Sequence, residues 1–248
     1  MNQTELLERL YPRLPRVTAL IGGGGKTTLL SALGETCARR GERVLLTTTT
    51  HLGWTPEAVC PGSVENLNRQ LIPGRAVLAG YPDAEHHKLT GIPTAWYAQL
   101  RADRILVEAD GSRCLPLKYH RTFEPVVPPD AGLVIELAGL AALGRPAGEV
   151  LHGWREAGID PVRTVDEALC AALLERGLSA ARSEAPKLVL LNQADTPALQ
   201  AQGEALVRRL EERGVVKNEN ATVTSLISKE DAQKSRLDEM MEDTFEGS

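Results

Sequence analysis

Short apolar runs alternate along the chain with longer segments in which apolar residues recur at helical spacing. The short runs are rich in valine, isoleucine and leucine and are bounded by turn-forming or polar residues, which predicts buried strands. They cover residues 17–21, 44–48, 76–79, 105–108, 133–137 and 187–191. The longer segments predict helices at 26–40, 94–101, 165–176 and 197–213. Apolar strands separated by helices are typical of a parallel sheet with helices on both faces, so we expect a three-layer α/β fold.

The remaining segments are expected to be irregular or peripheral. Residues 50–97 and 111–130 contain prolines and glycines and predict excursions over one edge of the sheet. A last strand is expected at 221–227, and residues 228–248 predict a peripheral helix or a flexible acidic tail. There is no repeat and no linker, so residues 1–248 are expected to form a single domain.

Four consecutive glycines lie between the first predicted strand and the first predicted helix, in the run Gly22-Gly23-Gly24-Gly25-Lys26-Thr27-Thr28. Glycine lets successive backbone N–H groups turn toward an anion, and a helix that begins there adds unpaired N–H groups and the positive end of its dipole. Lys26 is then placed to reach the outer phosphates of a nucleotide, and Thr27 to offer its hydroxyl to Mg²⁺. The run predicts a phosphate-binding loop (P-loop).

This loop is a variant of the common pattern. G-x-x-x-x-G-K-[ST] requires glycine at the position of Leu20. The ending G-G-x-G-K-T-T occurs in the signal-recognition and MinD-like branch of P-loop proteins, whose additional lysine would fall at Ile21. The alternative interpretation is a glycine-rich strand-to-helix turn with an incidental lysine.

A second nucleotide-binding element is predicted at the end of strand 105–108. In P-loop proteins an apolar strand ends in an acidic residue that holds Mg²⁺, and a glycine shortly afterwards bonds the γ-phosphate. Glu108 and Gly111 have this spacing, and Asp110 is the other candidate for the metal. The alternative is a carboxylate that caps the following turn.

A third element follows strand 187–191, where Asn192, Gln193 and Asp195 form N-Q-x-D. It resembles the N-K-x-D signature with which many GTPases recognise guanine, with glutamine in place of lysine. Asn192 and Asp195 are therefore candidate nucleotide ligands, and the choice between ATP and GTP stays open. The alternative is a polar turn in which Asp195 or Thr196 caps the next helix.

Four threonines and a histidine follow the second predicted strand, at 47–51. A threonine at that sheet edge can complete Mg²⁺ coordination or sense the γ-phosphate, which makes Thr49 or Thr50 a candidate ligand. His51 is a candidate general base. The alternative is an ordinary strand end.

Charge and composition argue against a nucleic-acid-binding protein, a membrane-spanning protein and a secreted protein. The 248 residues carry a net charge of −5 with scattered basic residues, so we expect no nucleic-acid partner. There is no apolar stretch long enough to span a membrane and no secretory signal pattern, so the expected location is the cytoplasm. The oligomeric state is left open.

Taken together, the motifs resemble the YqeC family. They are I-G-G-G-G-K-T-T-L-L, L-L-T-T-T-T-H-L, V-E-A-D-G-S-R-C-L-P-L-K followed by E-P-V-V-P, and L-L-N-Q-A-D, over about residues 15 to 200. This family is described as accessory proteins of selenium-dependent molybdenum hydroxylases. The resemblance implies a P-loop protein acting in maturation of such an enzyme, with the hydroxylase or its cofactor-insertion machinery as partner.

Three classes of function remain open. The first is a Mg²⁺-dependent NTPase that uses ATP or GTP, in which Lys26, Glu108 and Asp110 would be catalytic. The second is a small-molecule kinase or nucleotidyl transferase, whose anionic acceptor would lie near His51, Arg113, Lys118 and Glu124. The third is a nucleotide-binding module without turnover. The alternative interpretation of the basic loop around Lys118 is a solvated surface.

Overall fold

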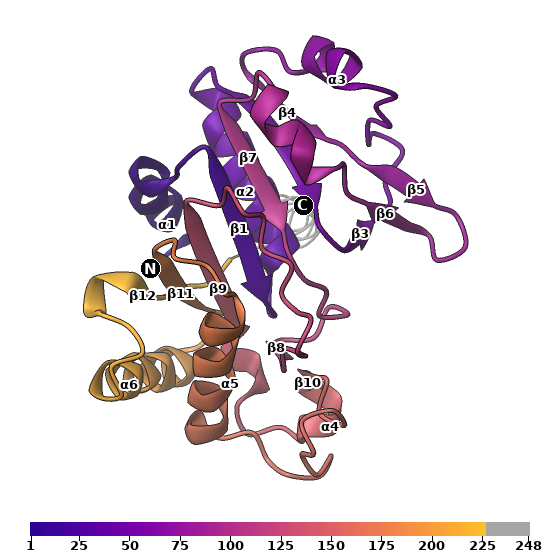
Figure 1. Ribbon diagram of the computed structural model, residues 1–248. Helices are drawn as coiled ribbons and strands as arrows, with labels where there is room; N and C mark the ends of the chain where they lie inside the picture. Colours follow the sequence, from indigo (N-terminus) through magenta and orange to yellow (C-terminus); the bar gives the residue numbers. More distant parts are fainter. Residues whose placement is uncertain (227–248) are drawn as a thin grey trace, which may run out of the picture.

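The computed structural model describes residues 1–226, and its centre is a parallel sheet of seven strands (Figure 1). The strand order is β12-β11-β9-β1-β7-β2-β4, and every neighbouring pair is parallel. The strands are β1 (Val17–Gly22), β2 (Arg43–Thr48), β4 (Arg75–Leu78), β7 (Arg104–Glu108), β9 (Leu133–Gly139), β11 (Lys187–Asn192) and β12 (Ala221–Val223). The predicted α/β class and its P-loop-like layering are confirmed.

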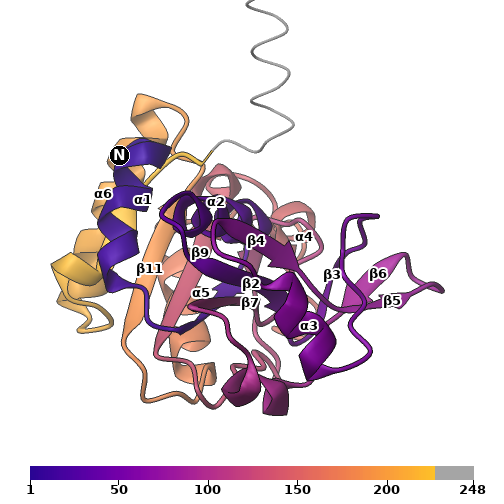
Figure 2. The ribbon, with the colours of Figure 1, turned by 90° about the horizontal axis from the view of Figure 1, so that it is seen from above.

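Helices cover both faces of the sheet, as Figure 2 shows for α2 and α5. On one face, α1 (Gln3–Leu10) and α2 (Lys26–Arg39) pack on strand residues that include Leu20. On the other face lie α5 (Glu167–Ala180) and α6 (Pro197–Glu212), together with α3 (Val64–Gln70) and the 3₁₀ helix η2 (Thr94–Gln99). All six residues of β1 are buried, which explains its continuous apolar sequence.

Short strands outside the central sheet form two small sheets. β3 (His51–Gly53), β5 (Tyr81–Asp83) and β6 (Lys88–Thr90) form an antiparallel sheet, and β8 (Leu117–Lys118) pairs with β10 (Leu151–His152). The other short helices are α4 (Ala147–Val150), η1 (Tyr11–Arg13), η3 (Leu140–Ala142) and η4 (Asn218–Asn220).

Several boundaries differ from the predicted ones. The helix predicted at 165–176 begins at Glu167, because the side chain of Asp166 caps it by accepting from Leu169 N, and it continues to Ala180. The segment predicted as helical at 94–101 is the 3₁₀ helix η2. The last predicted strand is β12, whereas the expected helix or tail at 228–248 lies outside the described residues.

The topology brings the predicted motifs to one edge. β1 lies between β7 and β9, with Leu20 in register with Glu108 and Gly22 with Leu137. In open α/β sheets, ligands bind outside the carboxyl ends of strands where the chain crosses to opposite sides. Here β1 is followed through α2 by β2 on one side, and β9 lies on the other.

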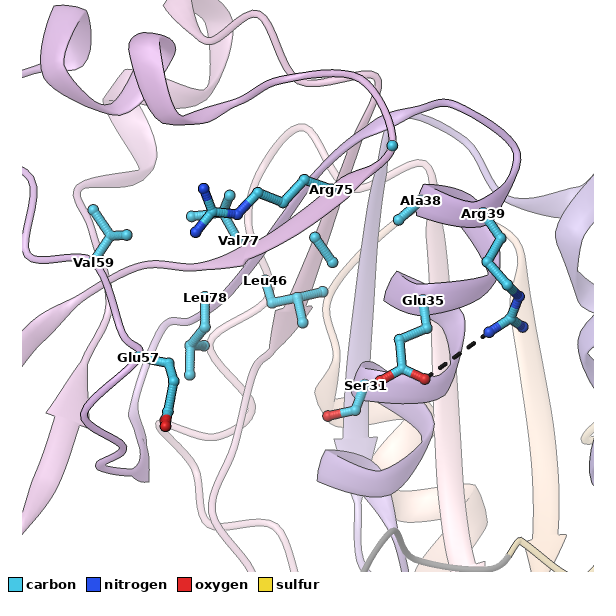
Figure 3. Close-up of a pocket in the computed structure, with 12 residues that line it drawn as sticks. Ser31, Glu35, Ala38, Arg39, Leu46, Glu57, Val59, Arg75, Val77 and Leu78 are labelled. Atoms are coloured by element: carbon cyan, nitrogen blue, oxygen red, sulfur yellow. Dashed lines mark ion pairs between the residues drawn. The ribbon is translucent and has the colours of Figure 1, made fainter.

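A separate groove of about 490 Å³ lies between α2 and β4 (Figure 3). Its lining includes Ser31, Glu35 and Arg39 from α2 and Arg75 and Leu78 from β4. It shares no residue with the glycine run that precedes α2.

Candidate functional site

The glycine run forms the turn between β1 and α2. Gly24 and Gly25 have φ of +74° and +118°, a region in which only glycine is free of strain. A Cβ on Gly24 would lie 2.4 Å from Gly139 N, so the loop also needs the close approach that glycine allows. Within residues 1–226, the backbone N–H groups of Gly25, Lys26, Thr27 and Thr28 have no protein acceptor. These N–H groups open the first turn of α2, where an anion is favoured.

The earlier part of the loop is held by the protein itself. Gly22 N donates to Asp110 Oδ2 at 2.9 Å, Gly23 N to Leu137 O at 2.9 Å and Gly24 N to Leu115 O at 3.1 Å. The loop is therefore tied to β9 and to the segment that follows β7.

Lys26 is buried at the centre of this site. Its Nζ donates to Gly22 O at 2.5 Å and to Ser112 Oγ at 3.3 Å, and it lies 3.1 Å from Asp110 Oδ1 and 3.9 Å from Glu108 Oε1. A buried ammonium costs several kcal/mol unless it is paired, and here two carboxylates surround it. The structure therefore brings Lys26 together with both acidic candidates.

Glu108 contacts the first turn of α2. Its Oε2 accepts from the Thr27 hydroxyl at 2.8 Å. Burial raises the pKa of Glu108, and the nearby Lys26 ammonium and the Thr27 hydroxyl oppose that increase. The carboxylate and the hydroxyl thus form an oxygen pair beside the free N–H groups.

Asp110 has a different environment, because it is completely buried against His120. His120 Nε2 lies 2.7 Å from Asp110 Oδ2, and both side chains are inaccessible to solvent. Burial by itself raises the pKa of Asp110, but the Lys26 ammonium and the hydrogen bond from His120 outweigh it and hold the pKa well below its usual range. Sequence reasoning missed His120, since one histidine in an irregular loop carries no pattern.

Glu136 is a third buried carboxyl near the site, and sequence reasoning missed it. It lies on β9 beneath α5, and a Cβ on Gly177 would be 1.9 Å from Glu136 Oε1 and 2.7 Å from His120 Cε1. Its Oε2 has no hydrogen-bond partner within residues 1–226. Burial, and then the charge of Asp110, raise the pKa of Glu136 well above its usual value. A signal was available, because Glu136 interrupts an otherwise apolar strand.

We expect Glu136→Gln to stabilise the protein at neutral pH. Between about pH 4.3 and the raised native pKa, the unfolded chain loses the Glu136 proton and the native protein keeps it, so stability falls as pH rises. Glu136 alone changes the free energy of unfolding by up to about 1.4 kcal/mol per pH unit. Glutamine does not titrate, so the substitution removes this pH dependence. Urea unfolding from pH 5 to 8 measures the difference. Glu204→Gln, on the exposed face of α6, is the control, and equal pH profiles for wild type and Glu136→Gln would contradict the assignment.

Asn192, at the end of β11, joins the site as a bracing residue. Its Nδ2 donates to Gly24 O at 2.7 Å, and its Oδ1 accepts from Leu226 N at 2.8 Å. Asp195 is exposed and accepts from the Ser225 hydroxyl, and Gln193 packs against Gly139. The N-Q-x-D segment therefore lies beside the glycine loop.

The side chains of the other candidates near β2 have partners other than Lys26, although Thr49 N donates to Glu108 O at 3.1 Å. Thr49 donates its hydroxyl to Val126 O at 2.6 Å, and the Thr50 hydroxyl lies 3.3 Å from that of Thr48. His51 is on the small antiparallel sheet, where its Nε2 lies 3.8 Å from Asp83 Oδ2.

The candidate acceptor site after β7 is largely internally paired. Lys118 is buried, with Nζ 2.5 Å from Gly111 O and 3.0 Å from Glu124 Oε1. Arg113 is exposed and has a φ of +52°. Of the basic and acidic residues proposed for a second substrate, Lys118 and Glu124 thus neutralise each other.

Residues 1–226 contain neither a candidate membrane span nor a preformed metal cluster. In this part of the chain no helix is both long and apolar enough to cross a membrane. Over the same residues, no three histidine, cysteine or acidic side chains form a cluster that could hold a metal ion unaided.

Comparison with known proteins identifies a family and a relative. The family model described as "YqeC protein" matches residues 18–155, which include the glycine loop, Glu108, Asp110 and His120. The Escherichia coli (strain K12) protein named "Uncharacterized protein YqeC" is 33% identical over 174 residues, covering 64% of this chain and 68% of the relative.

Proposed function

The chain belongs to the YqeC family, and from this premise and the geometry of the site we propose that it binds a nucleoside triphosphate with Mg²⁺. One observation carries the proposal: the buried Lys26 ammonium lies against the glycine loop, directly before a helix turn whose N–H groups have no acceptor within the described residues. These groups together offer a positive charge and several aligned donors. Both are what a polyphosphate requires.

The two acidic candidates receive different roles in this proposal. Glu108 and Thr27 are the residues that would hold Mg²⁺, since carboxylate and hydroxyl oxygens are the ligands it prefers and phosphates and water complete its shell. Bound there, the ion would neutralise phosphate charge. Asp110, hydrogen-bonded to Gly22 N and His120 and ion-paired with Lys26, is instead proposed to fix the loop and the lysine.

Hydrolysis of the triphosphate is the turnover that we propose, and a non-hydrolysing module is the alternative. The pairing of Lys118 with Glu124 gives little support to an anionic acceptor at that loop, so transfer to a second substrate ranks below hydrolysis. A cytoplasmic role in maturation of a selenium-dependent molybdenum hydroxylase rests on the family resemblance alone.

Titration calorimetry of the purified protein with ATP and with GTP, each with and without Mg²⁺, tests the proposal. We expect saturable binding of one triphosphate per chain that Mg²⁺ strengthens, and a phosphate-release assay then separates hydrolysis from binding. If neither nucleotide binds in the presence of Mg²⁺, the proposal is wrong.

Glu108→Gln is expected to lose most of the Mg²⁺ enhancement while Mg²⁺-free binding stays close to wild type. The amide still accepts from the Thr27 hydroxyl but carries no charge for the cation, which corresponds to about 1.5–3 kcal/mol, or roughly 10- to 150-fold in the Mg²⁺-dependent affinity. The same calorimetric series measures it, with Glu204→Gln as the control. An unchanged Mg²⁺ enhancement would contradict the proposal that Glu108 binds the metal ion.

A further inference from the structure

Two loops that are distant in sequence join at the edge of the candidate site. One follows β11, directly after Asn192, and contains Asp195, and the other follows β12 and contains Ser225. Thr224 N donates to Leu191 O at 2.8 Å and Ala194 N to Thr224 O at 3.1 Å. Backbone hydrogen bonds therefore fix the two loops to each other.

Asn192 connects this pair of loops to the glycine loop. Its side chain is buried and has one partner on each side, Gly24 O and Leu226 N. A Cβ on Gly25 would lie 2.5 Å from Asn192 Nδ2, so the contact is close. A nucleotide with its phosphates on the glycine loop would thus have the paired loops within reach of its nucleoside end.

Asp195 is the side chain that these loops present to a ligand. Helix α6 does not need it, because Thr196 is the N-cap and accepts from Leu199 N at 3.2 Å. Asp195 Oδ1 accepts from the Ser225 hydroxyl, whereas Oδ2 has no protein partner within residues 1–226. The alternative role as a helix cap is thereby removed, and an oriented, exposed carboxylate remains.

We propose that Asp195 recognises guanine, with Ser225 as the residue that positions it; this inference rests on the proposed triphosphate site. The Watson–Crick edge of guanine carries two adjacent donors, N1–H and the 2-amino group. An ionised carboxylate only accepts, so it matches both donors. Adenine has an unprotonated N1 at the same place. This nitrogen is a hydrogen-bond acceptor, so it cannot bond to the carboxylate, which is also an acceptor.

Competition titrations with the Mg²⁺ complexes of GTP, ITP, XTP and ATP test the inference. For wild type we expect GTP to bind about 10-fold more tightly than ITP, which lacks the 2-amino donor, and about 100-fold more tightly than ATP. In Asp195→Asn we expect GTP to weaken and XTP to gain, because the amide N–H can donate to the 2-carbonyl of xanthine. Asp130→Asn, before the amino end of β9, is the matched control and should keep the wild-type order.

Ser225→Ala separates a positioning role from a structural one. We expect the ratio of GTP to ATP affinity to fall while ATP affinity stays as in wild type. A loss of affinity that is equal for all four nucleotides would overturn the role of Ser225.

The outcomes distinguish the two proposals. Equal binding of ATP and GTP, or tighter ATP binding, in a protein whose binding is lost in Lys26→Met overturns the guanine inference and leaves the triphosphate site standing. An Asp195→Asn variant with wild-type nucleotide preference also overturns it. No binding of any of the four nucleotides overturns the proposed function and this inference with it.

Discussion

Replacing Lys26 by methionine is expected to raise the dissociation constant for the Mg²⁺ triphosphate by at least about 100-fold, equivalent to about 2.7 kcal/mol. Methionine fills the space of the aliphatic stem but has no ammonium to place among the phosphates. In the free protein that ammonium contacts Gly22 O and Asp110, so it lies against the loop where the ligand would bind. Calorimetry with the preferred triphosphate measures the change.

Two controls make the Lys26 result interpretable. Lys217→Met removes an exposed lysine that follows α6 and should bind as wild type does. Replacing Lys26 leaves Asp110 without its ion-pair partner and so lowers stability. Thermal unfolding therefore has to establish that Lys26→Met is folded at the temperature of the titration. A folded Lys26→Met protein with wild-type affinity would exclude the glycine loop as the phosphate site.

The largest effect on stability is expected for Asp110→Asn, a loss of about 3–5 kcal/mol at neutral pH. Asp110 Oδ2 accepts from Gly22 N and pairs with His120, and Oδ1 lies 3.1 Å from the Lys26 ammonium. The amide leaves that buried cation with only the more distant Glu108 carboxylate, at 3.9 Å, as a counter-charge. Urea unfolding of wild type and variant measures the difference. Asp130→Asn, whose side chain is exposed, is expected to change stability by less than about 0.5 kcal/mol.

The lowered pKa of Asp110 determines how this difference in stability changes with pH. Because the native pKa of Asp110 is lowered, its contribution to stability is fully present above the unfolded pKa of about 3.9 and is lost as pH falls through the native pKa. The gap between wild type and Asp110→Asn should therefore be constant from pH 5 to 7 and narrow below about pH 3.9. The double variant Lys26→Met, Asp110→Asn should lose less stability than the sum of the single variants, since both remove one ion pair. Additive losses would contradict the pairing.

The sequence was sufficient for most of the central sheet because its inner strands β1, β2, β7, β9 and β11 are buried on both faces. β1, for example, has no exposed residue and reads as a continuous apolar run. Helix α1 lies outside the predicted helices, although its sequence carries a signal: Asn2 and Glu5 form a capping box ahead of Leu6 and Leu10. The small sheet of β3, β5 and β6 had no such signal, since its strands have three residues each and only Leu52 and Leu89 among them are buried.

For the candidate site, sequence spacing located the elements but not the contacts between them. Glu108 and Asp110 are two residues apart and were equivalent by spacing, whereas the structure bonds Glu108 to Thr27 and Asp110 to His120. The partner of Asp195, Ser225, lies 30 residues further along the chain. Such pairings depend on strand order, which periodicity does not encode.

The hydrogen bonds of the glycine loop have a thermodynamic consequence for affinity. Four consecutive glycines would be a highly flexible segment in isolation, because glycine has more backbone freedom to lose on folding than any other residue. The bonds from Gly22, Gly23 and Gly24 to Asp110, Leu137 and Leu115 remove that freedom when the chain folds, so a ligand meets a preorganised cradle and bears less of the ordering cost. Loosening the segment that contains Leu115 would therefore weaken ligand binding through entropy alone, without altering any atom that the ligand touches.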